Sequence, residues 1–153
     1  MQKLLFLLLS VALSANDSQA QSIVGSWRTI SQLIVNEDGS KKDLMVMQTR
    51  RWACMADLQT IFEANGKQLM KTSANCSTPI NYDKLPPSDW KMTGHNISIT
   101  NKSTPGPLGT TATYTVEFSG NKAILTHEYS TAEKQQLPGS AKIKKVVITY
   151  QRL

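Results

Sequence analysis

The amino-acid sequence predicts an all-β protein, an up-and-down antiparallel β-barrel of about eight strands. The first observation is a rhythm: short β-branched or aromatic runs are followed by turns roughly every eight to twelve residues. The second is that no segment after residue 20 has a convincing helical pattern. Such a rhythm fits a sandwich or a barrel. We favour the barrel, because strands in meander order with one polar face can close and leave no unpaired sheet edge.

The strand runs follow one another in order and are separated by recognisable turns. Besides the cysteine-containing hairpin described below, we expect strands at residues 27–35, 44–52, 90–92, 97–100, 111–118, 123–129 and 143–153. Gly120 stands first in the two-residue turn with Asn121, which indicates a type II′ turn and pairs residues whose numbers sum to 241. Segments rich in Ser, Asn, Pro and Gly are expected to be loops, at 73–89, 101–109 and Pro138-Gly139.

Cys54 and Cys76 bracket a predicted hairpin of strands 58–63 and 67–72. Gly66 ends a three-residue loop, where the positive φ of that position favours glycine. Paired residue numbers in this hairpin sum to 130, and so do 54 and 76. We therefore predict a disulfide, as two cysteines in a secreted chain usually pair. The alternative is a pair of free or metal-binding thiols, but the only histidines, His95 and His127, lie far away in the sequence.

Residues 1–20 are expected to be a signal peptide rather than part of the fold. Lys3 precedes a predominantly apolar run at 4–13, and small residues stand before a cleavage point between Ala20 and Gln21. This run is much shorter than the ~20 apolar residues of a spanning helix. We therefore expect residues 21–153 to form one secreted or periplasmic domain, with no transmembrane segment.

The formal net charge of +6 limits the classes of partner. The basic residues are spread along the chain and gather in three places only, Lys41-Lys42, Arg50-Arg51 and Lys142, Lys144 and Lys145. An ordinary solubilising surface accounts for this distribution. The alternative is attraction to an anionic membrane, a polysaccharide or an acidic partner. No basic segment is interleaved with aromatic residues, so we expect no nucleic-acid partner.

Two features near the ends of the domain resemble a known group. Gly25-Ser26-Trp27 opens the first strand, and Arg152 ends the last. This G-x-W opening with a terminal basic residue resembles the lipocalins and their calycin relatives. The spacing C-x2-D-x4-F-x3-G-x9-C from Cys54 to Cys76 is similar to that of small secreted bacterial lipocalin-like domains. The resemblance implies that Trp27 closes the base of the barrel beneath the guanidinium of Arg152, with Gly25 beside them.

Little in the sequence points to catalysis. No nucleophile with a base, no phosphate-binding loop and no carboxylate pair stands out, so we expect a protein that is not an enzyme and has no metal or cofactor. His127 and Tyr114 are expected to be cross-strand neighbours. They form either a polar pair for a ligand or a half-buried histidine satisfied by the tyrosine hydroxyl. The inward-facing candidates for ligand binding are Phe62, Met70, Tyr114, Val116, Leu125, His127 and Tyr150.

Two functions remain open at this stage. The leading hypothesis is a monomer that binds a small hydrophobic molecule inside the barrel, supported by the inward aromatic residues and by numerous methionines, which adapt to irregular ligands. The alternative is a barrel filled by its own side chains. It would bind a protein or an envelope polymer, for example as an inhibitor, through loops 73–89 and 101–109. A continuous apolar cavity of roughly 300 Å³ or more favours the first hypothesis.

Overall fold

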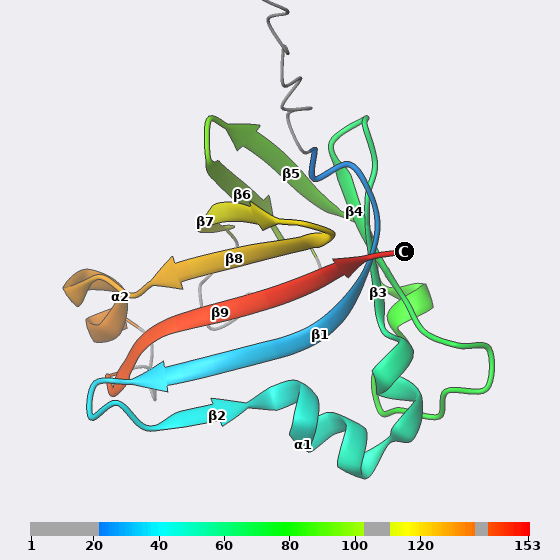
Figure 1. Cartoon of the computed structure of the whole chain (residues 1–153), viewed down its shortest axis with the longest axis horizontal. Coiled ribbons are helices and arrows are strands. Elements are labelled where there is room, and N and C mark those ends of the chain that lie inside the picture. The colour runs from blue at the N-terminus through cyan, green and yellow to red at the C-terminus, as the bar shows by residue number, and fades with distance from the viewer. Residues whose placement is uncertain (1–21, 103–110, 137–140) are drawn as a thin grey trace, which may run out of the picture.

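The computed structural model describes residues 22–102, 111–136 and 141–153. Within them the chain forms a closed, up-and-down antiparallel barrel of eight strands with short helices outside it (Figure 1). This confirms the predicted fold class. The expected signal peptide and its cleavage point between Ala20 and Gln21 lie outside the described residues. So do most of the expected loop at 101–109 and the turn at Pro138-Gly139.

Nine strands occur in the described residues, and eight of them form the barrel. In chain order they are β1 (Gly25–Asn36), β2 (Lys41–Asp43), β3 (Gln59–Phe62), β4 (Lys67–Lys71), β5 (Ser88–Thr93), β6 (Asn96–Thr100), β7 (Thr111–Ser119), β8 (Lys122–Glu128) and β9 (Ile143–Arg152). Neighbours pair in the order β1-β3-β4-β5-β6-β7-β8-β9, and β9 returns to β1. This last pairing runs from Trp27 opposite Arg152 to Asn36 opposite Ile143. β2 pairs only with the second half of β1.

The two predicted hairpin registers are confirmed. In the β3–β4 hairpin, residue 59 pairs with 71 and residue 62 with 68, so the numbers sum to 130. The backbone N–H of Glu63 donates to the carbonyl of Lys67, and Gly66 has a φ of +82°. In the β7–β8 hairpin the sum is 241. Gly120 has a φ of +58° whereas Asn121 does not have a positive φ, as the type II′ turn requires.

The expected strand at 44–52 is wrong, because this segment forms helix α1 (Leu44–Arg51). Asp43 caps the helix by accepting a hydrogen bond from the backbone N–H of Met45 at 2.9 Å, and Arg50 and Arg51 favour the negative end of the helix dipole. The apolar run by itself is too short to distinguish a strand from a helix. The capping aspartate and the two terminal arginines favour the helix. The chain then turns through the 3₁₀ helix η1 (Ala53–Asp57).

The expectation that the domain contains no helix is wrong at two further places. Helix α2 (Thr131–Gln136) follows β8, and the 3₁₀ helix η2 (Tyr82–Lys84) lies within the expected loop 73–89. The start of α2 is a capping box, in which the hydroxyl and backbone N–H of Ser130 donate to Glu133. Within the described ranges, no helix combines the length and apolar character needed to cross a bilayer.

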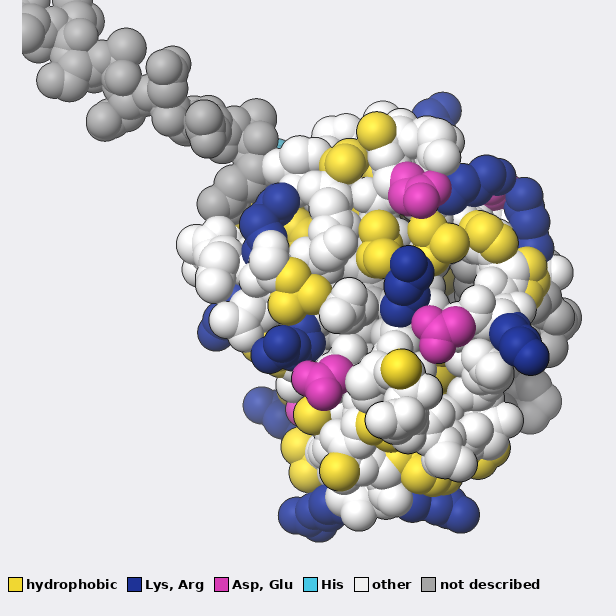
Figure 2. All heavy atoms as spheres, turned by 90° about the vertical axis from the view of Figure 1, so that its right-hand side faces the viewer, with side chains coloured by type: hydrophobic (Ala, Val, Ile, Leu, Met, Phe, Trp, Pro, Cys, Tyr) yellow, Lys and Arg dark blue, Asp and Glu magenta, His cyan; other side chains and the backbone are white. Residues whose placement is uncertain are grey.

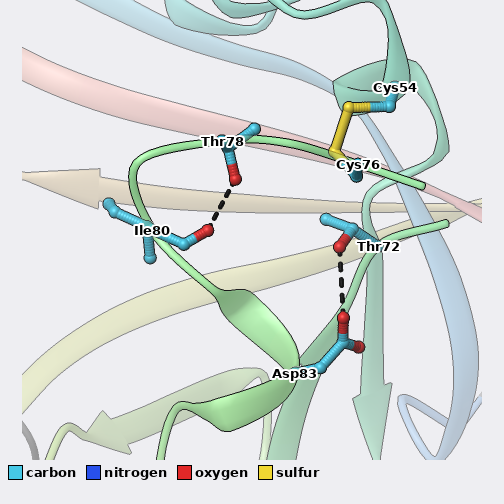
Figure 3. The surroundings of a disulfide bond; sticks show 6 residues. All are labelled: Cys54, Thr72, Cys76, Thr78, Ile80 and Asp83. Atoms are coloured by element: carbon cyan, nitrogen blue, oxygen red, sulfur yellow. Dashed lines mark hydrogen bonds between the residues drawn. A yellow bond between two sulfur atoms is a disulfide. The ribbon is translucent and has the colours of Figure 1, made fainter. Parts of the chain in front are cut away.

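Cys54 and Cys76 form a disulfide with a Cα–Cα separation of 5.4 Å, as predicted (Figure 3). The geometry differs from a simple extension of the hairpin, because Cys54 lies in η1 and Cys76 in the loop after β4. The disulfide therefore joins η1 to this loop rather than one strand to another. A hydrogen bond from the Thr72 hydroxyl to Asp83 further holds the loop, at 3.2 Å.

The barrel is closed at one end by a base core, which we define as the buried cluster around Trp27. Its other buried members are Ile23, Phe62, Ile97, Ile99, Val116, Ala123, Leu125 and Tyr150. A second cluster lies under α1 and η1, where Met45, Met55 and Leu58 are buried against Trp52, Met70 and Tyr82. The short helices are therefore held to the barrel by apolar contacts as well as by the disulfide.

Trp27, Arg152 and Gly25 meet at the base, as the resemblance implied. The guanidinium carbon of Arg152 lies 4.3 Å from the centre of the Trp27 ring. The indole N–H donates to the carbonyl of Ile23 at 2.6 Å, and the guanidinium donates to backbone carbonyls of the segment before β1. Gly25 has a φ of +133°, and a Cβ there would lie 3.2 Å from Nη1 of Arg152. A larger residue at position 25 would therefore be strained and would press against the cation.

Replacement of Trp27 by alanine is expected to lower the free energy of unfolding by ~3–5 kcal/mol, because the ring is almost completely buried in the base core. Guanidinium denaturation measures this change. Arg152→Lys keeps the charge but loses the planar contact, and should cost only ~0.5–1 kcal/mol. A Trp27→Ala protein as stable as the parent would contradict the role given to this ring.

Removal of the disulfide by Cys54→Ser together with Cys76→Ser is expected to cost roughly 3 kcal/mol, since the bond closes 22 residues of chain in the unfolded state. The same denaturation experiment measures it, and amide NMR should show the β3–β4 pairing retained. Two thiols that can be alkylated in the native, unreduced protein would show that the bond is not formed.

Candidate functional site

A cavity of about 210 Å³ lies inside the barrel beside the base core. Residues from β1, β3, β4, β6, β7 and β9 surround it, so it is part of the barrel interior rather than a cleft between surface elements. Its lining comprises Thr29, Gln32, Leu58, Thr60, Gln68, Met70, Ile99, Asn101, Tyr114, Ile148 and Tyr150. Apolar side chains thus alternate with hydroxyl and amide groups.

The polar groups of this cavity are neutral. Burial raises the pKa of Tyr150 to about 12, an effect that the Thr60 hydroxyl partly offsets. Burial also raises the pKa of Tyr114, with smaller contributions from Tyr150 and Tyr129. Both phenols therefore keep their proton at physiological pH and can donate a hydrogen bond. Among the described residues lining the cavity, none is an acid, a base or a histidine.

The Thr60 hydroxyl is the least satisfied group of the lining. Its oxygen is buried and forms no hydrogen bond of normal geometry with a described residue. It lies close enough to the Tyr150 phenol to lower the pKa of that group. The Thr60 hydroxyl is therefore a buried polar group of the cavity lining that can donate or accept a hydrogen bond.

The structure divides the seven ligand-binding candidates into three groups. Met70, Tyr114 and Tyr150 line the cavity. Phe62, Val116 and Leu125 belong to the solid base core and do not line it. Phe62 instead packs edge-on against Trp90 and Tyr150, with ring centres 5.7 and 6.0 Å away. Strand parity correctly predicts that these side chains point inward, but not that neighbouring side chains fill the space around them.

His127, the seventh candidate, lies where β7 and β8 separate, beyond the last paired residues Thr115 and Thr126. Its Nδ1 is 2.7 Å from the carbonyl oxygen of Thr113. Since a carbonyl only accepts, Nδ1 carries a hydrogen and donates it. The ring contacts Tyr114 and Tyr129, with centres 5.7 and 4.9 Å away. His127 is thus a neighbour of Tyr114 as expected, but its hydrogen bond goes to the backbone and not to the tyrosine hydroxyl.

His127 also connects the barrel to α2. Its Nε2 lies 3.2 Å from Oε1 of Glu133, a contact that is an ion pair when both ring nitrogens carry a hydrogen. Hydrogen bonds from the Ser130 hydroxyl and backbone N–H lower the pKa of Glu133, and the nearby His127 adds to this effect. Lys134 of the same helix pairs with Glu37 in the turn between β1 and β2. Side-chain contacts therefore hold α2 to the barrel at both β8 and the β1–β2 turn.

A second, outer groove of about 720 Å³ runs beside His127. It is lined mainly by outward-facing residues of β7, β8 and β9, including Glu117, Glu128 and Lys145. Hydroxyl pairs cover the neighbouring strands, such as Ser98 with Thr113 at 3.0 Å. The groove is polar and open, and its lining does not indicate one class of ligand as the lining of the interior cavity does.

Sequence reasoning missed the polar part of the interior site, namely Thr29, Gln32, Thr60, Gln68 and Asn101. Thr60 and Gln68 have the same strand parity as Phe62 and Met70, so the signal was available. The candidate list was restricted to apolar, aromatic and histidine side chains, so these polar residues were not included. Among the described residues, no group of three or more His, Cys, Asp or Glu side chains could hold a metal ion.

Comparison with known proteins adds no further assignment. The chain matches no protein-family model, and no curated protein or solved structure is significantly similar to it. The interpretation of the interior cavity therefore rests on its own geometry and chemistry.

The attachment of α2 is expected to weaken in acid. The lowered pKa of Glu133 means that its carboxylate stabilises the fold above the ordinary value of 4.5 and that this contribution is lost as pH falls through the lower folded value. The protection factors of the amides of residues 131–136, which are the exchange rates corrected for the intrinsic effect of pH, should therefore fall upon acidification. Glu133→Gln should show low protection already at neutral pH, whereas Glu128→Gln, at an exposed position, should not. Identical protection in the parent and in Glu133→Gln would contradict this role of Glu133.

Proposed function

We propose that this chain is a lipocalin-like binding protein that holds a small, neutral molecule in the interior cavity. The ligand has an apolar part and at least one hydrogen-bonding group. The Gly25-Ser26-Trp27 opening, the contact of Trp27 with Arg152 and the closed barrel all support the lipocalin-like class. The disulfide is compatible with a secreted or periplasmic location.

The observation that carries this proposal is an interior cavity whose lining combines the buried Thr60 hydroxyl and two neutral phenols with apolar side chains. A ligand that donates or accepts one hydrogen bond at Thr60 would be oriented within the cavity by it. Met70, Ile99 and Ile148 supply the apolar contacts on other sides of the cavity.

The cavity size restricts the ligand to small molecules. A volume of about 210 Å³ has room for about seven water molecules at ~30 Å³ each. It is below the roughly 300 Å³ at the lower end of ordinary ligand pockets, and its lining is partly polar, so the criterion set from the sequence for a purely hydrophobic ligand is not met. A fatty acid would be too long, and its carboxylate would find no cationic side chain in the described lining. An uncharged aromatic or short-chain alcohol fits both the volume and the polarity.

The second candidate is a binding module that acts through its surface loops. The observation in its favour is that Phe62, Val116 and Leu125 fill the base of the barrel, so only part of the interior is hollow. In this case the segment between β4 and β5, fixed by the disulfide and by the bond from Thr72 to Asp83, would contact the partner. Neither candidate includes a catalytic step.

The two candidates differ in what Thr60→Val should do to ligand affinity. If the interior cavity binds a ligand through the hydroxyl, the valine should weaken that ligand about ten-fold, whereas the loop-binding candidate predicts no alcohol binding to either protein. Calorimetric titration with a panel of neutral aromatic and aliphatic alcohols measures the affinity, and guanidinium denaturation measures the stability. Thr113→Val, which removes an exposed hydroxyl, is the matched control.

A second variant, Met70→Trp, tests the cavity by filling it. The indole should abolish binding of any alcohol that the parent binds and leave the base core intact. If no member of the panel binds the parent, the barrel interior is not a site for such molecules and the loop-binding candidate is favoured.

A further inference from the structure

The outward face of α1 combines exposed apolar and basic side chains. Helical geometry places Val46, Met47, Arg50 and Arg51 on the side opposite the buried Met45. Their exposure agrees with this, since 46% of Val46 and 47% of Met47 are accessible to solvent. Single exposed apolar residues are ordinary on protein surfaces. On α1 two adjacent apolar residues are exposed, and Arg50 and Arg51 each follow one of them by one helical turn. Apolar and cationic side chains therefore lie together on one face of the helix.

The charge around this face is positive. Lys41 and Lys42 of β2 come just before α1 and are exposed, as are Arg50 and Arg51 in its last turn. Asp43 is the only carboxylate between residues 41 and 56. It is engaged internally, because the Ser31 hydroxyl and the backbone N–H groups of Gln32 and Met45 donate to it. Hydrogen-bond donors thus already occupy the only acidic group of this segment.

Further exposed apolar side chains lie beside α1. Ile80 is 50% exposed and borders α1 across a small cleft that Gln48 and Trp52 also line. On the other side, a groove of about 200 Å³ separates Val46 from Ile30 of β1. Figure 1 places β2 and α1 along the lower edge of the molecule. Figure 2 shows hydrophobic side chains along that edge, between two groups of Lys and Arg side chains.

This part of the chain is firmly attached to the barrel. Met45 and Met55 are buried in the cluster under α1, and the disulfide at Cys54 fixes the chain immediately after the helix. The Arg51 guanidinium lies over the Trp52 ring, 4.7 Å from its centre. The helix therefore presents its outward side chains from a fixed position and does not need to fold upon contact with a partner.

We propose that this face binds the surface of an anionic phospholipid membrane. The α1 surface, defined as Lys41, Lys42, Val46, Met47, Arg50 and Arg51, lies against the bilayer. Val46 and Met47 enter the boundary between headgroups and acyl chains, and the four cations contact lipid phosphates. A bilayer surface offers apolar and anionic groups over the same plane, which matches their interspersed arrangement on one helix face. An acidic protein or polysaccharide would use the cations but not the two apolar residues.

The inference does not depend on the interior cavity. None of the residues of the α1 surface lines that cavity; the cavity lining reaches α1 through Leu58 and Met70, which pack in the cluster on its buried side. Failure of the alcohol panel would therefore leave membrane binding intact, and failure of membrane binding would leave the interior site intact.

The test is co-sedimentation of residues 21–153 with vesicles of half phosphatidylglycerol and half phosphatidylcholine, and with vesicles of phosphatidylcholine alone. The N-terminal apolar run is omitted because it would itself insert into lipid. The parent should bind the anionic vesicles and dissociate in about 0.5 M NaCl, which screens the charges. Arg50→Gln with Arg51→Gln should weaken binding roughly 25-fold, at about five-fold per charge. Val46→Ser with Met47→Ser should weaken it about ten-fold or more.

Two matched variants serve as controls. Lys122→Gln with Lys144→Gln removes the same charge from exposed positions on β8 and β9, and Leu153→Ser removes an exposed apolar side chain at the base. Both should bind as the parent does, and thermal unfolding should show all variants folded. Absence of binding to anionic vesicles, or unchanged binding after Val46→Ser with Met47→Ser, overturns the proposal. If heparin binds equally well and is insensitive to the serine variant, the partner is a soluble polyanion instead.

Discussion

The pairing of the first strand with the last is the constraint upon which the rest of the structure depends. β1 and β9 run side by side from Trp27 and Arg152 at one end to Asn36 and Ile143 at the other. This closes the sheet into a barrel, in which β4 and β5 form the shortest ladder, with only Lys67 paired with Asp89 and Gln68 with Ser88. It also places the guanidinium over the indole at the base. The flat ring thereby shields the cation, and the cation covers the ring, at the point where the two ends of the domain meet.

The interior of the closed barrel is filled by side chains near its base and contains the cavity further along. Near Trp27, large side chains such as Phe62 and Leu125 meet from opposite strands and fill the space completely. Further along, Thr29, Thr60 and Gln68 take the inward positions, and their smaller or polar side chains leave the cavity. The binding site proposed here is thus the part of the interior that the core side chains do not reach. Its small volume and neutral lining both arise because polar residues occupy inward positions there, whereas bulky apolar residues occupy them near the base.

The segment between β1 and β3 carries the α1 surface that we propose as a second binding site. Its helix needs both a buried side, which Met45 supplies, and a fixed end, which the disulfide at Cys54 supplies. Once these are satisfied, the opposite side of α1 contributes nothing to the core. That the exposed positions there carry valine, methionine and arginine is therefore not explained by the stability of the fold. The proposed contact surface would account for them, and it shares no residue with the proposed interior site.

The sequence by itself determined the local pairings. The glycines at 66 and 120 select their turn types, and a turn sets the register of both strands that it joins, so the sums of 130 and 241 hold. The contact of Trp27 with Arg152 was accessible through the motif that resembles lipocalins. Only the tertiary structure decided that residues 44–51 form a helix, because an apolar run of that length suits either state until it has a surface to pack on. It also decided which inward residues meet a cavity, since alternation along a strand gives the direction of a side chain but not the volume that its neighbours leave.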